Sequence, residues 1–163
     1  MKGCLRNERG LTLLELLIAV AIIVIIAGVG IPTYLKFRST SQHAEANLNL
    51  NGIKQFEESY KLGNGIYINC AVSPRPVAAL DETTLAWTDL GIGFTSIGFG
   101  TNAPVRFVYA VTGATTTSFL AEAAGDTNRD GNDILFVASP TIGPRVVQLG
   151  DAVTLGADTQ NID

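Results

Sequence analysis

The sequence predicts an α+β protein in which one long N-terminal helix is followed by an antiparallel sheet of three or four strands. Three observations support this fold class. Residues 11–31 are apolar apart from a single carboxylate, and a helical pattern without proline continues from Thr33 to about Leu62. The remainder contains short segments rich in β-branched and aromatic residues. Because the connections between these segments are short, antiparallel pairing is expected.

Length and charge exclude several classes of function. The chain has 163 residues and a mass of 17.2 kDa, which suits one folded body. Its net charge of −4 gives no electrostatic basis for direct nucleic-acid binding. The only histidine, His43, has no partner that would make it a catalytic base, and no phosphate-binding loop motif is present. We therefore expect no enzymatic activity.

The apolar segment 11–31 is long enough to cross a membrane, at about 30 Å for a helix. Basic residues before it predict that its N-terminal end stays in the cytoplasm. It could be a simple anchor, an ordinary signal peptide cleaved near residues 27–30, or a segment preceded by a cleavage site after Gly10. Glu15 favours the third interpretation. A carboxylate inside a membrane helix costs about 2.5–3.5 kcal/mol, and neither an anchor nor a signal peptide has a use for one.

The residues around this carboxylate resemble the N-terminus of type IV pilins and pseudopilins. The similarity consists of Arg9-Gly10, the following Leu-Thr-Leu-Leu-Glu ending at Glu15, and an apolar run that reaches Pro32. In that family a prepilin peptidase cleaves after the glycine and N-methylates the new first residue. Here that residue would be Leu11, where phenylalanine is commonest. The resemblance covers about the first 50 residues.

The resemblance implies a division into a cleaved leader (1–10), a transmembrane and filament-core helix (11–32) and a globular head (33–163) with the pilin fold. It implies an inner-membrane precursor and subunit pool. Inner-membrane assembly machinery would then polymerise the subunit into a helical homopolymer, a cell-surface type IV pilus for adhesion, motility or DNA uptake. The sequence is most like a major pilin. A type II secretion pseudopilin is the first alternative, and a secreted binding protein with an ordinary signal peptide is the second.

Glu15 has two interpretations. Cleavage after Gly10 creates an α-amine on Leu11 with an ordinary pKa of about 8. Glu15 of a neighbouring subunit could neutralise that amine in an apolar filament core and so fix the register of assembly. Alternatively, Thr12-x-x-Glu15 has the spacing of a capping box at a helix N-terminus. Both roles can hold at different stages.

Pro32 also has two interpretations. A proline inside a helix removes one backbone hydrogen bond and clashes with the preceding turn, and Gly28 and Gly30 weaken the same stretch. The result could be a kink tolerated in a membrane helix. Alternatively, residues 27–32 melt in the assembled filament. Extended chain is about twice as long per residue as helix, so melting would let the filament stretch.

In the head, the continuing helix is expected to end at Gly63-Asn64-Gly65. Its sheet-facing side is predicted to hold Phe37, Ala44, Leu48, Phe56 and Tyr60. The residues predicted to face solvent or neighbouring subunits are Glu45, Asn49, Lys54, Glu58 and Lys61. Residues 64–104 should form an irregular loop, with a short strand or helical turn near residues 85–90. We expect Trp87 to anchor this loop to the core, with a ligand-binding role as the alternative.

Four segments are predicted as strands: 105–111, 116–123, 134–138, and 146–149 with an extension toward 155. One face of the sheet should pack on the helix, and the other should be largely Thr, Ser, Arg and Glu. Cys4 leaves with the leader, so Cys70 has no partner within the chain. A buried or idle thiol is expected there.

An acidic loop lies between the second and third predicted strands. Asp126, Asn128 and Asp130 alternate as in the first half of an EF-hand loop, but the twelfth position is Val137 rather than glutamate. The loop is therefore not an EF-hand. It could bind Ca²⁺ through Asp126, Asn128, Asp130 and Asp133, as some pilin and pseudopilin heads do, or be a polar β-turn at Asp130-Gly131.

Overall fold

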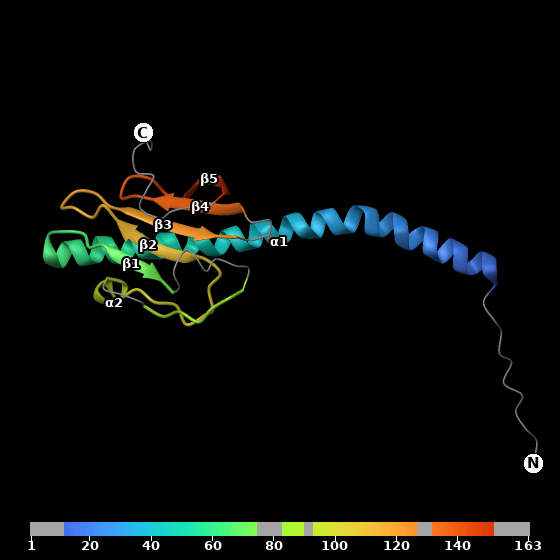
Figure 1. The fold of residues 1–163 in the computed structure, drawn as a ribbon, viewed down its shortest axis with the longest axis horizontal. Coiled ribbons are helices and arrows are strands. Elements are labelled where there is room, and N and C mark those ends of the chain that lie inside the picture. The colour runs from blue at the N-terminus through green and yellow to red at the C-terminus, as the bar shows by residue number, and fades with distance from the viewer. Residues whose placement is uncertain (1–11, 75–82, 90–92, 127–131, 152–163) are drawn as a thin grey trace, which may run out of the picture. The chain divides into compact units, whose positions relative to one another are not determined.

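The computed structural model describes residues 12–74, 83–89, 93–126 and 132–151. The chain divides into two compact units, Met1–Arg38 and Ser39–Asp163. Figure 1 shows the elements in chain order. They are α1 (Leu13–Asn64), β1 (Cys70–Ser73), α2 (Phe94–Ile97), β2 (Val108–Thr112), β3 (Leu120–Gly125), β4 (Asn132–Ala138) and β5 (Arg145–Asp151).

Helix α1 extends over 52 residues, which confirms the single long helix predicted from the sequence. Thr12 precedes its first residue, and the Thr12 hydroxyl accepts a hydrogen bond from the Glu15 amide at 3.2 Å. The helix ends at Asn64, where Gly65 adopts a positive φ of 78° and its amide donates to the Lys61 carbonyl at 2.7 Å. A left-handed residue just after the last turn is a common way to stop a helix.

The first unit consists, in its described part, of the apolar portion of α1. Its best 18-residue window has a mean hydropathy of 2.9, and none of that window is buried. By length and composition this portion could cross a membrane. Pro32 lies within the helix, which is continuous on both sides of it.

The sheet of the second unit is an antiparallel meander with strand order β1-β2-β3-β4-β5. The antiparallel prediction is confirmed, but five strands form rather than three or four. The additional strand is β1, which has only four residues and an irregular register against β2. A strand this short lacks a clear alternating pattern, which explains why it was not predicted from the sequence.

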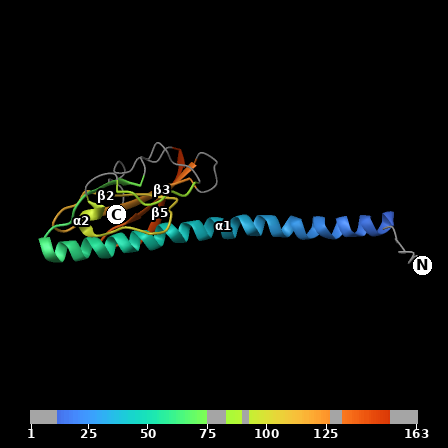
Figure 2. The same ribbon diagram turned by 90° about the horizontal axis from the view of Figure 1, so that it is seen from below.

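The second half of α1 packs along one face of the sheet, as Figure 2 shows from below. The prediction of which side of the helix faces the sheet was wrong, because Leu48 is 73% exposed and Phe37 is 71% exposed. The buried residues instead follow a different stripe of the helix, at i, i+4, i+8, i+11 and i+15. They are Gln42, Ala46, Leu50, Ile53 and Glu57. Polar residues at both ends of this stripe hid it from a search for apolar spacing.

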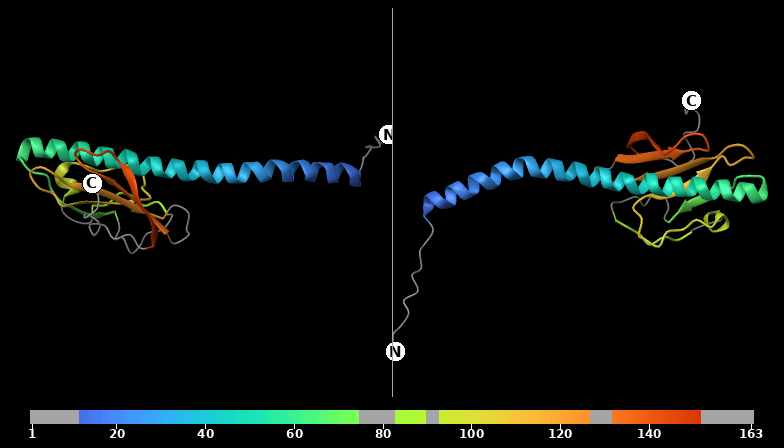
Figure 3. Two further views of the ribbon diagram at one scale, coloured as in Figure 1. Left: turned by 90° about the horizontal axis from the view of Figure 1, so that it is seen from above. Right: turned by 180° about the vertical axis from the view of Figure 1, so that it is seen from behind.

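The opposite face of the sheet was also predicted wrongly. A second buried cluster occupies it, made by Val108, Ala124, Leu135 and Val137, none of them more than 2% exposed. Side chains alternate between the faces of a strand. Val108 therefore points away from the helix, whereas its neighbours on β2 point toward it. Figure 3 shows the sheet beside the second half of α1 from two further sides.

Trp87 anchors the irregular segment before β2, as predicted. Its ring lies 5.2 Å from both Phe94 and Phe99 in edge-on contacts, measured between centroids, and 6.0 Å from Tyr109. Near the predicted element at 85–90 the structure has one isolated bridge, Leu85 to Val105. The short helix lies later, as α2.

Candidate assembly site at the start of helix α1

The structure describes only some of the residues that were predicted to control processing and assembly. Gly10 and Leu11 lie outside the described residues. Thr12 is described and sits at the N-cap of α1, where its hydroxyl accepts from the Glu15 amide and its carbonyl from the Leu16 amide at 3.2 Å. Glu15 is thus the third residue of the helix. Of the two hydrogen bonds that make up a capping box, this is the one that the Thr12 hydroxyl accepts. The structure supports the capping interpretation for the single subunit.

The surroundings of Glu15 are apolar and open. Leu13 is 87% exposed and Leu17 is 69% exposed, and Glu15 is the only charged residue between Thr12 and Leu35. A helix that exposes apolar side chains all round requires lipid or other helices as its surroundings. A carboxylate in such surroundings requires a cation, and this helix has none within that stretch. The geometry therefore leaves the Glu15 carboxylate available to a positive group from outside α1.

The stretch around Pro32 lacks one helical hydrogen bond, because proline has no amide hydrogen to donate to the Gly28 carbonyl. One residue further along, the Thr33 hydroxyl donates to the Val29 carbonyl at 2.9 Å. A Cβ built on Gly28 or Gly30 would meet no atom within 4 Å. Contacts within the subunit therefore do not require either glycine. Local melting of residues 27–32 concerns the filament and stays a prediction.

The acidic loop is mostly outside what the structure describes. Asn128 and Asp130 fall in the gap at 127–131, and only the backbone of Asp133 is described, in β4. Asp126 is described, just after β3. In the ranges that surround this gap, no group of three or more His, Cys, Asp or Glu side chains could hold a metal ion. Calcium binding by Asp126, Asn128, Asp130 and Asp133 stays a prediction.

Polar side chains of α1 hold the helix against the sheet, a role that was not predicted from the sequence. A Glu45 carboxylate oxygen accepts from the Arg106 amide at 2.7 Å, and the Asn49 amide donates to the Tyr109 hydroxyl at 2.8 Å. Both Glu45 and Asn49 were expected to lie away from the sheet. Each directly precedes a buried residue of the helix stripe, so its side chain reaches the edge of the interface. A correct prediction of the buried stripe would therefore have placed Glu45 and Asn49 at the edge of this interface.

Glu57 is the most deeply buried of these groups, with an exposed fraction of 0%. Its carboxylate accepts from the Ile68 amide at 3.1 Å and from the Cys70 thiol at 3.6 Å. Burial raises the pKa of Glu57, and the hydrogen bond from Ile68 opposes this only partly. Burial also raises the pKa of the Cys70 thiol. Cys70 is thus a buried, protonated thiol, as the sequence analysis predicted.

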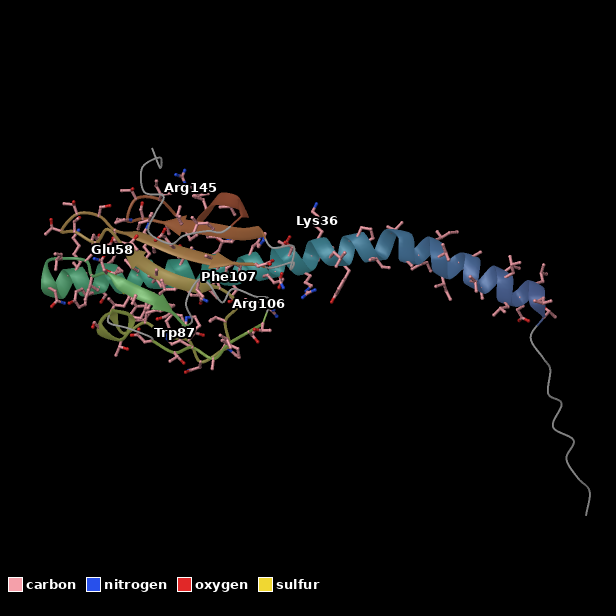
Figure 4. All side chains as sticks on the ribbon, in the orientation of Figure 1. Lys36, Glu58, Trp87, Arg106, Phe107 and Arg145 are labelled. Atoms are coloured by element: carbon pink, nitrogen blue, oxygen red, sulfur yellow. The ribbon has the colours of Figure 1, made fainter. Side chains whose placement is uncertain are left out.

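A further set of polar contacts lies at the last turns of α1, where Figure 4 labels Glu58. The Tyr67 hydroxyl donates to a Glu58 carboxylate oxygen at 2.7 Å, and Lys61 Nζ donates to the same hydroxyl at 3.3 Å. Lys61 Nζ also lies 4.4 Å from the centre of the Tyr67 ring. Burial, followed by the Glu58 carboxylate, raises the pKa of Tyr67 to about 12. The chain after α1 is thereby held to the helix it leaves.

Comparison with known proteins agrees with this arrangement. The model of the prokaryotic N-terminal methylation motif matches residues 5–31. The type IV wide pilus major component PilA4 of Thermus thermophilus is 29% identical over 92% of this chain and 94% of its own length. No solved structure gives a significant match.

Two further relatives match about a third of the chain. The type IV major pilin PilA of Myxococcus xanthus is 44% identical over 33% of this chain and 24% of its own length. The type IV major pilin PilE of Neisseria gonorrhoeae is 38% identical over 37% of this chain and 36% of its own length.

An apolar helix with a single carboxylate near its start, continued into a head with an antiparallel sheet, defines a pilin-type subunit. This chain is similar to the type IV pilins both in its N-terminal methylation motif and, through one relative, over almost its whole length.

Proposed function

We propose that this protein is a major type IV pilin, cleaved after Gly10, held in the inner membrane by residues 11–32 and polymerised into a surface filament. The observation that supports this most strongly is the apolar N-terminal half of α1. None of its most apolar window is buried, and Glu15 is its single carboxylate. In the filament, packed copies of this helix would replace the lipid around it. Adhesion, motility and DNA uptake are the roles open to such a filament.

Assembly would need two kinds of partner besides further copies of the chain. A prepilin peptidase would cleave between Gly10 and Leu11 and methylate the new amine. Inner-membrane assembly machinery would extract the subunit from the bilayer. The three relatives described above are all named as major components of type IV pili, which favours a pilus over a secretion pseudopilus.

The assembly role of Glu15 can be separated from its capping role. We expect Glu15→Ala to leave processing and membrane content unchanged but to abolish surface filaments, because the Leu11 amine would have no counter-charge in the apolar core. Thr12→Ala is the matched control. It removes the hydroxyl that caps the helix, at a cost of about 1 kcal/mol, and should leave filaments in place.

Electron microscopy and quantification of sheared filaments measure the result. Normal filament amounts in the Glu15→Ala strain would contradict the proposed pairing. Equal loss in both variants would assign Glu15 to helix capping alone.

A further inference from the structure

A groove of about 540 Å³ opens on the side of the head that contains α2. Trp87 and Phe99 form its aromatic wall, and the short segment from Gly98 to Asn102 forms its rim. Figure 4 shows the labelled Trp87 in this part of the head. The volume lies in the range typical of small-ligand sites.

The groove is open beside the indole because Gly100 stands where a side chain would cover one edge of the ring. A Cβ built on Gly100 would lie 3.6 Å from Cδ1 and Nε1 of Trp87, in ordinary contact with that edge of the ring. Gly98 has a positive φ of 79°, which disfavours other residues there. Any larger residue at position 100 would therefore extend into the groove beside the indole N–H.

Hydrogen-bonding groups line the groove at fixed positions. The Asp89 carboxylate is held rigidly, since it accepts from the Thr95 amide at 2.8 Å and from the Thr95 hydroxyl at 2.7 Å. The Thr95 hydroxyl oxygen keeps a lone pair for a further donor. Asn102 also lines the groove and is exposed. Within the part of the chain that the structure describes, no group accepts a hydrogen bond from the Trp87 indole N–H.

The charges that line the groove limit the classes of ligand that it could bind. Its described lining contains one carboxylate and no Lys, Arg or His, so an anion such as a phosphate or a nucleic-acid backbone would be repelled. An aliphatic ligand would leave the indole N–H and the Asn102 amide without partners. A neutral molecule with one apolar side and several hydroxyls satisfies both the aromatic wall and the polar rim. A pyranose ring has this chemistry.

We propose that this groove is a binding site for a neutral sugar, with an apolar face of the ring against Trp87 and Phe99. Hydroxyl groups of the sugar would pair with the Trp87 indole N–H, the Thr95 hydroxyl and the Asn102 carboxamide. The proposal is independent of filament assembly, because every residue of the groove belongs to one subunit. The groove is open along one side, so a single ring should bind weakly, with a dissociation constant that is roughly millimolar.

The test uses the full chain in a zwitterionic detergent that contains no sugar. Trp87 is the only tryptophan in the chain, so its fluorescence reports directly on the groove. The probes are the methyl glycosides of glucose, galactose and N-acetylglucosamine, and sorbitol is the open-chain control. At least one glycoside should give a saturable change in emission, and sorbitol should give none.

Gly100→Val should weaken binding of that glycoside at least tenfold, because its methyl groups would occupy the groove beside the indole. Gly143→Val is the matched control. It makes the same change at an exposed glycine with no atom within 4 Å of its Cβ position, and it should bind as the unmodified chain does. Circular dichroism confirms that both variants are folded. No saturable response to any glycoside, an equal response to sorbitol, or unchanged binding by a folded Gly100→Val variant would each overturn the proposal.

Discussion

The buried carboxyl group of Glu57 makes the stability of the head depend on pH in a direction opposite to that of most carboxylates. Glu57 is fully buried beneath the segment that leaves α1, and its carboxylate accepts hydrogen bonds from one backbone amide and one thiol. Neither is a cation. The substitution Glu57→Gln keeps the shape and an acceptor for the Ile68 amide, but it removes the charge and the titration.

The direction of this pH dependence follows from the raised pKa of Glu57. The folded state binds the Glu57 proton more tightly than the unfolded chain, where the pKa is near its ordinary value of 4.5. The contribution of Glu57 is therefore fully present below that value and is lost as pH rises through the folded pKa. One group can change the free energy of unfolding by at most about 1.4 kcal/mol per pH unit in that window.

The size of the effect can be estimated from the contacts. Removing a buried charge that has no ionic partner is worth about 1–4 kcal/mol. Replacing the charge-assisted bond from Ile68 by a neutral one costs about 1 kcal/mol. We therefore expect Glu57→Gln to be more stable than the unmodified head by up to about 3 kcal/mol above the folded pKa. Glu57→Ala should instead lose about 2–4 kcal/mol, because it leaves the Ile68 amide unpaired and opens a cavity.

Urea unfolding of the fragment Ser39–Asp163, followed by Trp87 fluorescence, measures these differences. The fragment contains every buried residue of the described chain. The stability of the unmodified head minus that of Glu57→Gln should fall as the pH is raised from about 4 to about 8. Subtraction removes the contributions of the other carboxylates. A difference that stays constant or rises with pH would refute the assignment of a raised pKa to Glu57.

Three further predictions concern the core, the proline region and the acidic loop. Leu50→Ala, at a fully buried position of α1, should lower the free energy of unfolding by about 2–5 kcal/mol. Leu48→Ala, two positions away and exposed, should change it by less than about 0.5 kcal/mol; equal losses in urea unfolding would contradict the buried stripe. In intact filaments, amide exchange measured by mass spectrometry should be fast across Gly28–Pro32, and helical protection there would exclude local melting. If the loop with Asp126, Asn128, Asp130 and Asp133 binds calcium, millimolar Ca²⁺ should raise the Tm of the head, whereas an unchanged Tm would leave it a polar turn.

The N-terminal half of the molecule could be predicted well from the sequence, because its determinants are local. A run of apolar residues, a threonine three positions before Glu15 and a glycine pair at the end are enough to set the length and both ends of α1. The family resemblance rests on the same residues. What Glu15 pairs with depends on a neighbouring subunit and so cannot be inferred from one chain.

The head was predicted less well because its packing depends on partners distant in sequence. The buried side of α1 begins with Gln42 and ends with Glu57, so apolar spacing selected the wrong face. Glu57 becomes compatible with burial only because Ile68 and Cys70 fold back onto it. Trp87 was correctly predicted as an anchor, since one large aromatic residue in a polar loop has few other roles. The groove beside it depends on the backbone path through Gly98 and Gly100, which no sequence pattern indicated.

The most direct test of the central claim is mass spectrometry of the N-terminus of the main protein in sheared surface filaments. A filament subunit of this family should begin at Leu11, with its α-amine methylated, and should retain Glu15 and the whole apolar helix. A main component that is a different protein, or a mature form of this chain that begins near Ile31, would contradict the claim. The second result would mean that an ordinary signal peptidase had removed the helix on which assembly depends.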